Sequence, residues 1–85
     1  MQGLGVKFIV VTFITRDHVL LMEQHVDDPE TIELTVRQSM SRMRWDYAIY
    51  PWMGRWVLLS VRRGPSHVRY YDSKEAAEMV AIHGG

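Results

Sequence analysis

The chain of 85 residues contains no cysteine, so neither a disulfide nor a thiolate metal site can stabilise it. Its longest apolar run, VKFIVVTFI, is far shorter than the roughly 20 residues that a membrane-spanning helix needs. The start, MQGLGVKFIVV, lacks a basic segment, and no small-residue cleavage site follows it, so we expect no signal peptide. Together these absences predict a cytoplasmic protein with no membrane contact.

The chain also lacks net charge, because ten basic residues balance ten acidic ones. Phosphate contacts need clustered cations, so this balance disfavours non-specific nucleic-acid binding as the main role. The charges are nevertheless unevenly spread. Residues 1–41 hold three basic and six acidic side chains, whereas residues 42–85 hold seven basic and four acidic ones. Halves of opposite sign attract each other within a fold or across a dimer.

Motifs for catalysis or metal binding are missing. The four histidines do not have the His-x-x-x-His spacing of a helical zinc site, and no serine lies in a Gly-x-Ser-x-Gly setting. No glycine-rich loop stands between a strand and a helix, where phosphates bind. We therefore expect no catalytic residue, no metal and no cofactor. One enzymatic alternative remains, a site formed across a dimer interface near Asp46 and His67.

Apolar residues make up 47% of the chain, which is high for so short a sequence. A chain of this length forms one domain, residues 1–85, and buries only about two thirds of its unfolded surface. Without disulfides or metals, association with a second copy is the remaining way to bury more apolar surface. The composition therefore predicts a homodimer.

Two helices and up to five strands are predicted from the spacing of apolar residues. The run 6–15 is apolar on both faces, which indicates a central strand covered on both sides. Residues 29–43 follow an Asp-Pro helix start and carry an apolar stripe, and the final helix opens at Asp72, with Glu75 at capping-box spacing. On that helix Ala76, Met79, Val80 and His83 share the expected packed face. The remaining strands are expected at 45–50, 55–63 and 67–71, separated by the turn segments PWMG and GPS, while 19–24 is either a strand or a helical turn.

The expected fold is therefore α+β. A four- or five-stranded, mostly antiparallel sheet packs against two helices, in the order β(β)αβββα. The last three strands form a meander.

The meander region, residues 41–71, holds all three tryptophans, all four tyrosines, six arginines and one acid, Asp46. Asp46 is expected to pair with a neighbouring arginine rather than to act as a base. Because side chains alternate along a strand, Val57, Leu59 and Val61 are expected to face the helices. With them we place Trp45, Tyr47, Ile49, Val68 and Tyr70. The opposite face is expected to carry Asp46, Ala48, Tyr50, Trp56, Leu58, Ser60, Arg62, His67, Arg69 and Tyr71.

Three interpretations fit this second face. Aromatic and arginine side chains are enriched at protein interfaces, which favours a dimer or partner surface. Aromatic rings beside cations also suit the stacking of single-stranded bases. In the third interpretation, Arg62 and Arg69 lie over Trp56 and Tyr71 within the fold, and either the final helix or the edge of the first strand covers the rest.

The sequence hence predicts a small non-catalytic binding protein of accessory, regulatory or inhibitor type. It is expected to be a homodimer that contacts an unidentified protein. The alternative is a nucleic-acid-binding module that uses the same face. The residues expected to make these contacts are Tyr50, Trp56, Leu58, Arg62, Arg63, Arg69 and Tyr71.

Overall fold

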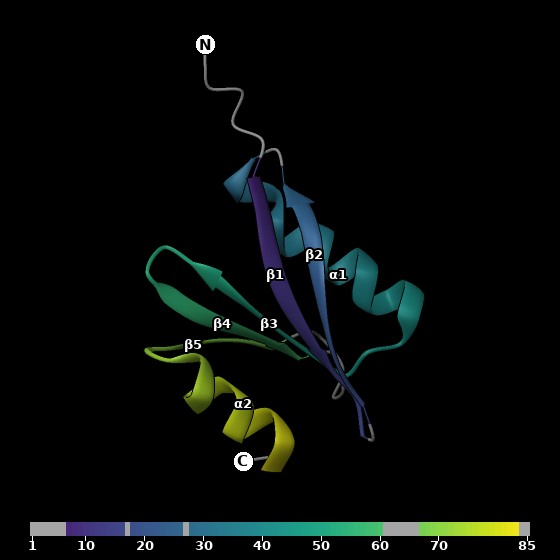
Figure 1. Cartoon of the computed structure of the whole chain (residues 1–85), viewed down its shortest axis with the longest axis vertical. Coiled ribbons are helices and arrows are strands. Elements are labelled where there is room, and N and C mark those ends of the chain that lie inside the picture. Colours follow the sequence, from purple (N-terminus) through teal and green to yellow (C-terminus); the bar gives the residue numbers. More distant parts are fainter. Residues whose placement is uncertain (1–6, 17, 27, 61–66, 84–85) are drawn as a thin grey trace.

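The computed structural model contains one five-stranded antiparallel sheet with a helix on each face (Figure 1). The structure describes residues 7–16, 18–26, 28–60 and 67–83, with the side chains at 7, 29 and 67 left aside. The elements are β1 (Lys7–Ile14), β2 (Val19–Val26), a 3-10 turn (Pro29–Thr31), α1 (Ile32–Met43), β3 (Tyr47–Trp52), β4 (Arg55–Ser60), β5 (His67–Tyr71) and α2 (Lys74–His83). This order confirms the predicted α+β fold and makes residues 19–24 part of a strand.

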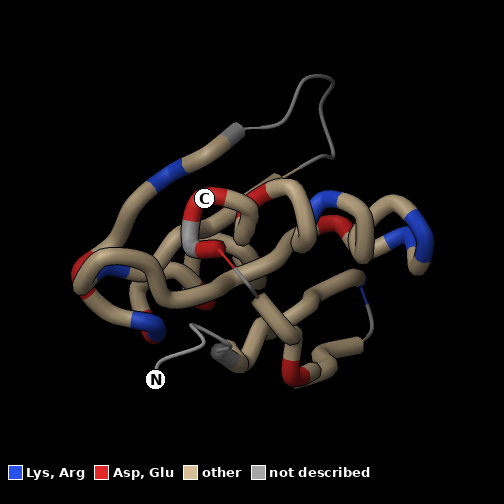
Figure 2. The backbone as a smooth tube through the Cα atoms, turned by 90° about the horizontal axis from the view of Figure 1, so that it is seen from above, with Lys and Arg blue, Asp and Glu red and all other residues tan. Residues whose placement is uncertain are grey.

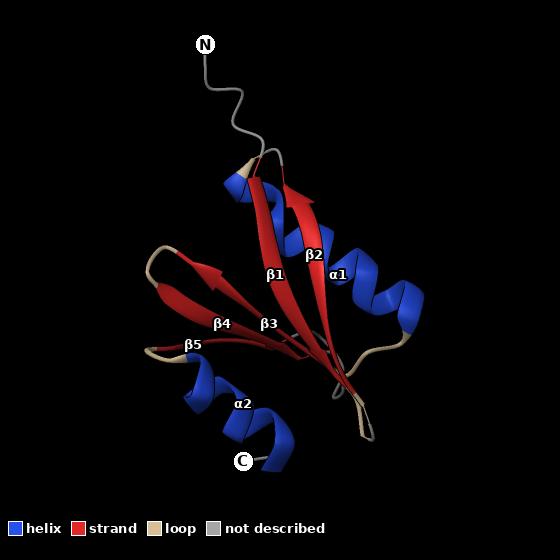
Figure 3. Ribbon diagram, viewed as in Figure 1, coloured by secondary structure: helices blue, strands red, loops and turns tan. Residues whose placement is uncertain are grey.

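The strands are arranged β2-β1-β3-β4-β5, so β2 and β5 form the two edges. The β1–β2 hairpin is paired without interruption from Lys7–Val26 to Ile14–Val19. The β3–β4–β5 meander is likewise antiparallel, as predicted. Helix α1 connects the edge strand β2 to β3, and these two strands lie on either side of β1. Helix α2 follows β5. Figure 3 shows the resulting three layers, with the sheet between the two helices.

The helical segment begins close to the predicted position, because Asp28 caps the 3-10 turn Pro29–Thr31 that precedes α1. The Asp28 Oδ1 atom accepts a hydrogen bond of 3.1 Å from the Glu30 amide, and the Asp28 carbonyl accepts one of 2.8 Å from the Thr31 amide. The helix ends at Arg44, whose left-handed conformation (φ 60°) directs its amide to the Met40 carbonyl. The predicted helix of 29–43 therefore begins with a 3-10 turn and then continues as α-helix.

The face of the sheet beneath α1, which we name the α1 face, holds the larger core. Ile32, Val36 and Met40 form the buried stripe of the helix, as the spacing predicted, whereas Met43 is exposed. From the sheet, this core contains Val11, Phe13, Val26, Ala48, Tyr50, Val57 and Leu59.

Helix α2 covers the opposite side, the α2 face, over β3, β4 and β5. Both helices were expected on one side of the sheet, and this expectation is wrong. Ala77 and Ala81 are buried against Ile49 and Leu58 in this second core. Alanines four residues apart let the helix axis approach the sheet closely, because their side chains are small.

The packed face of α2 differs from the prediction by one position. Ala76, Met79 and His83 were expected to pack, but all three are exposed, and only Val80 of that set is half-buried. The cap differs as well. Ser73 Oγ, rather than Asp72, accepts a hydrogen bond of 3.1 Å from a first-turn amide, that of Ala76.

Strand β3 also lies one position away from its predicted register, which reverses its faces. The turn between β3 and β4 consists of Met53 and Gly54 alone, both at positive φ (51° and 78°), as in a type I′ hairpin. Pro51 and Trp52, expected in the turn, continue the strand opposite Trp56 and Arg55. Ala48 thus lies opposite Leu59 and Tyr50 opposite Val57, so Ala48 and Tyr50 face α1. Tyr47 and Ile49 face α2.

The sheet opens between β1 and β3, because these strands pair only from Thr12–Ile49 to Ile14–Tyr47 (Figure 1). Pro51 lies beyond the last of these pairs. Trp52 and Arg55 flank the two-residue turn as a hydrogen-bonded pair, so by alternation the nitrogen of Pro51 points away from β4, toward β1. A proline there has no hydrogen to donate, which is tolerated where the neighbouring strand diverges.

No helix among the described residues is long and apolar enough to cross a membrane. The acidic and basic residues, separated along the sequence, are mixed in space. In Figure 2, positions of both signs occur at the left and at the right of the molecule.

The assignment of the packed α2 face can be tested with paired leucine substitutions. Ala77 is fully buried, so we expect Ala77→Leu to overpack the core and to lower the free energy of unfolding by about 1–3 kcal/mol. The control Ala76→Leu lies on the exposed side and should change it by less than about 0.5 kcal/mol. Urea unfolding of the three proteins measures both. The reverse order would mean that the face predicted from sequence is the packed one.

Candidate functional site

The residues expected to form one binding surface lie on both faces of the sheet. Tyr50 is buried on the α1 face (3% exposed), and Leu58 is buried on the α2 face (3% exposed). Trp56 and Tyr71 are half-buried beside Leu58, and Arg69 is exposed opposite it on β5. Arg62 and Arg63 lie outside the described residues. Strands β4 and β5 therefore alternate as expected, and the separation of Tyr50 follows from the shifted register of β3.

Helix α2 covers much of the face on which a partner was expected. Ala77 and Ala81 pack over Leu58, and Val80 packs against the same cluster as Trp56 and Tyr71. The third interpretation allowed the final helix as a cover for this face, and its arginine contacts with Trp56 and Tyr71 stay a prediction. Of the side chains expected to make contacts, Arg69 is the most exposed among those described.

Asp46, the single acid of the aromatic stretch, has a structural partner other than arginine. Its Oδ2 atom accepts a hydrogen bond of 3.1 Å from Thr15 Oγ1, and its amide donates to the Ile14 carbonyl at 3.1 Å. Asp46 thus connects the chain entering β3 to the end of β1. His67 lies opposite Ser60 in the register of β4 and β5.

Exposed apolar side chains gather instead on the β1–β2 hairpin. Phe8 (61% exposed), Val10 (47%), Val19 (56%) and Leu21 (56%) all lie on the α2 face, beyond the part that α2 covers, which comprises β3, β4, β5 and Ile14 at the end of β1. We name these four residues the hairpin patch. Strand β1 was expected to be covered on both sides. On this side Thr12 and Ile14 are buried, whereas Phe8 and Val10 are exposed.

The hairpin patch borders the free edge of β2, and the turn at Thr15–His18 fixes how that edge is presented. The amides and carbonyls of Thr15 and His18 bond each other, at 2.9 and 3.3 Å. In an antiparallel ladder such pairs alternate with non-bonded ones, so even-numbered residues of β2 bond β1. The outward backbone groups therefore belong to Val19, Leu21, Glu23 and His25.

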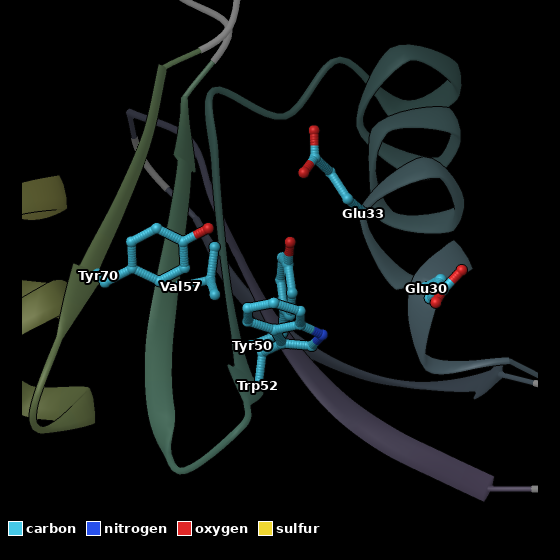
Figure 4. Close-up of a pocket in the computed structure, with 6 residues that line it drawn as sticks. All are labelled: Glu30, Glu33, Tyr50, Trp52, Val57 and Tyr70. Atoms are coloured by element: carbon cyan, nitrogen blue, oxygen red, sulfur yellow. The ribbon is translucent and has the colours of Figure 1, made fainter.

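A separate pocket of about 70 Å³ lies on the α1 face, between the first turns of the helical segment and the meander (Figure 4). We name it the Trp52 pocket. Trp52 and Tyr70 extend from β3 and β5, with ring centroids 6.2 Å apart. Val57 lies between them on β4, and Glu33 projects toward them from α1 (Figure 4). Its lining consists of Glu30, Glu33, Tyr50, Trp52, Val57 and Tyr70.

Tyr50 forms the buried wall of the Trp52 pocket, and its surroundings disfavour ionisation. Burial raises the pKa of the Tyr50 phenol, and the nearby Glu33 carboxylate raises it further. The pocket is thus a site of low polarity and negative potential. Sequence analysis missed it because Trp52 was placed in a turn. Tyr50 and Trp52 alternate along the chain as they would on one face of a strand, and this pattern could have indicated that β3 continues through Pro51.

Among the residues that the structure describes, no three histidine, aspartate or glutamate side chains are grouped so as to hold a metal ion. Comparison of the chain with known protein families, with curated proteins and with solved structures finds no match. The two features that distinguish this α+β domain are therefore the hairpin patch with its open edge and the Trp52 pocket.

The burial of Tyr50 predicts a specific loss of stability at alkaline pH. A phenol whose pKa is raised in the folded state stabilises the protein below the ordinary pKa of about 10, and this contribution is lost as the pH rises above it. We expect the urea midpoint of the native chain to fall more steeply between pH 9 and 11 than that of Tyr50→Phe. Tyr71→Phe, on the other face, is the control. Parallel pH profiles for the native chain and Tyr50→Phe would contradict the prediction.

Proposed function

We propose that this chain is a non-catalytic binding protein that acts as a homodimer, joined through the free edge of β2. The observation that carries the proposal is the coincidence of two features on the same residues. Val19 and Leu21 direct their backbone groups outward at the edge, and their side chains belong to the hairpin patch. A strand that offers both hydrogen bonds and apolar contacts is suited to pairing with another strand.

Edge strands of monomers usually carry features that prevent such pairing, such as proline, lysine or a bulge. Strand β2, VLLMEQHV, has neither proline nor lysine, and its eight residues are paired with β1 without a bulge. Glu23 is its one acidic residue. A regular edge of this length supports a ladder with a second copy.

The charge of Glu23 restricts the register of the pairing. In a twofold-symmetric antiparallel pair centred on Glu23, the two carboxylates would lie opposite each other, which is unfavourable. When the pair is centred on Leu21, Leu21 lies opposite Leu21 of the second copy, and Leu20 lies opposite Met22 of the second copy. We therefore propose pairing centred on Leu21, or one residue further along at Met22.

Such a dimer joins the two hairpin patches on the same side of a continuous sheet. Phe8, Val10, Val19 and Leu21 from each copy then lie on one surface that neither α2 covers, together with the Glu23 and His25 side chains of the same face. A surface of this kind suits the apolar side of another protein. We propose this contact as the accessory or regulatory activity of the protein, in place of a contact through the aromatic residues that α2 covers.

Proline substitutions at neighbouring positions test the edge. The Leu21 amide points outward, so Leu21→Pro removes no hydrogen bond within the chain but blocks the ladder with a second copy. We expect the native chain to be dimeric in size-exclusion chromatography with light scattering, and Leu21→Pro to be a folded monomer by circular dichroism.

The control Met22→Pro removes a β1–β2 hydrogen bond and should unfold the hairpin. A native chain that is monomeric at high micromolar concentration, or a Leu21→Pro variant that remains dimeric, would refute pairing at this edge.

The nucleic-acid alternative remains a separate proposal with its own measurement. Phosphate contacts release counterions, so such binding must weaken steeply between about 50 and 200 mM salt. Fluorescence anisotropy with labelled single-stranded and duplex DNA measures it, and Arg69→Ala should reduce the salt dependence if the predicted face is used. Binding that is absent or insensitive to salt removes this alternative.

A further inference from the structure

The Trp52 pocket combines aromatic rings with carboxylates, and it lies apart from the proposed dimer edge. Trp52 is half-buried and Tyr70 is 49% exposed, so both rings are accessible from solvent. Their planes are tilted by 36°, so the two rings are not stacked face to face, and both line the same pocket. Figure 4 shows Glu33 projecting from α1 toward the same space.

The divergence of the sheet helps to create this space. Tyr50 and Trp52 lie on the part of β3 beyond the last pair with β1, so no β1 residue lies opposite them in the ladder. Helix α1 covers the α1 face of this region, but its first turns contribute carboxylates rather than apolar side chains. The pocket is therefore lined by rings on the sheet side and by acids on the helix side.

The charge at the pocket is negative. The Arg37 guanidinium donates two hydrogen bonds to Glu33 Oε2, of 2.8 Å from Nε and 2.5 Å from Nη2. The charge of Arg37 therefore balances one of the two carboxylates. Glu30 is exposed at the rim and adds a second. The helix N-terminus contributes roughly half a positive charge, which is less than one carboxylate supplies. Burial raises the pKa of Tyr50, Glu33 raises it further and Arg37 lowers it, so Arg37 offsets part of the effect of Glu33 at the buried wall.

We propose that the Trp52 pocket binds the head group of a small organic cation, a methylated ammonium, between Trp52, Tyr70 and Glu30. Ring faces attract such a cation through their quadrupoles while contacting its methyl groups. A bare metal ion would need several oxygen ligands, and an anion would be repelled by the acids. A cavity of about 70 Å³ suits a head group, since one water needs only about 10–15 Å³.

The pocket can be tested by titrating the full-length protein with choline and with 3,3-dimethyl-1-butanol, which has the same shape without the charge. The readout is the indole Nε1–H signal of Trp52 in a ¹⁵N–¹H spectrum, assigned from its absence in Trp52→Leu. The indoles of Trp45 and Trp56 serve as internal references. We expect saturable shifts of the Trp52 signal with choline in the millimolar range, at constant ionic strength, and no shift with the alcohol.

Variants assign the contributions of the ring and the charge. We expect Tyr70→Leu to weaken choline binding ~5–30-fold, and Glu30→Gln to weaken it several-fold and to reduce its salt dependence. Tyr71→Leu changes the neighbouring residue, on the α2 face, and should leave binding unchanged. Glu30 is exposed, so its substitution should not disturb the fold.

The source of the cation is distinguished by a second titration with a short peptide that contains trimethyllysine. Tighter binding of the peptide than of choline assigns the pocket to a protein side chain, and the reverse assigns it to a free small molecule. Leu21→Pro should bind choline as the native chain does, so a failure of the proposed dimer is distinguishable from a failure of the pocket. Equal shifts with the neutral alcohol, or no shift of the Trp52 signal with any cation, would overturn the proposal.

Discussion

The structure depends on the two-residue turn at Met53 and Gly54. Its positive φ angles fix the register of β3 against β4, and with it the face on which every β3 side chain lies. Tyr50 is thereby directed into the core beneath α1, and Ile49 into the core beneath α2. A turn longer by one residue would exchange these two side chains and would remove Tyr50 from the wall of the pocket.

The fold was largely predictable from the sequence, because local patterns and tertiary packing agree over most of the chain. Asp28, Ile32, Val36 and Met40 specify the start and the packed face of α1 without reference to any other element. The alternation of β4 and β5 was equally clear. Each of these patterns is a local property, since it is complete within one element.

The prediction was wrong in β3 and α2, where a shift by one residue changes which side chains face the core. Met-Gly is not among the dipeptides that usually indicate a type I′ turn, so Pro51 and Trp52 were assigned to the turn and β3 was reversed. On α2, Ser73 rather than Asp72 accepts a hydrogen bond from a first-turn amide, and the packed face includes Ala77 rather than Ala76. The hairpin patch and the Trp52 pocket were not predictable for a further reason. Exposure depends on where each helix ends over the sheet, and strand alternation does not contain that information.

Two short helices cannot cover both faces of a five-stranded sheet. Helix α2 covers β3, β4 and β5 and leaves the hairpin patch exposed. On the α1 face, Glu30 of the 3-10 turn and Glu33 of α1 line the helix side of the pocket. The uncovered regions therefore lie on opposite faces, the patch on the α2 face and the pocket on the α1 face. Pairing at the β2 edge leaves the pocket open, because Trp52 and Tyr70 belong to β3 and β5, on the far side of β1. The proposed dimer would present one joined surface and two separate pockets, so the two proposed binding activities would not compete for space.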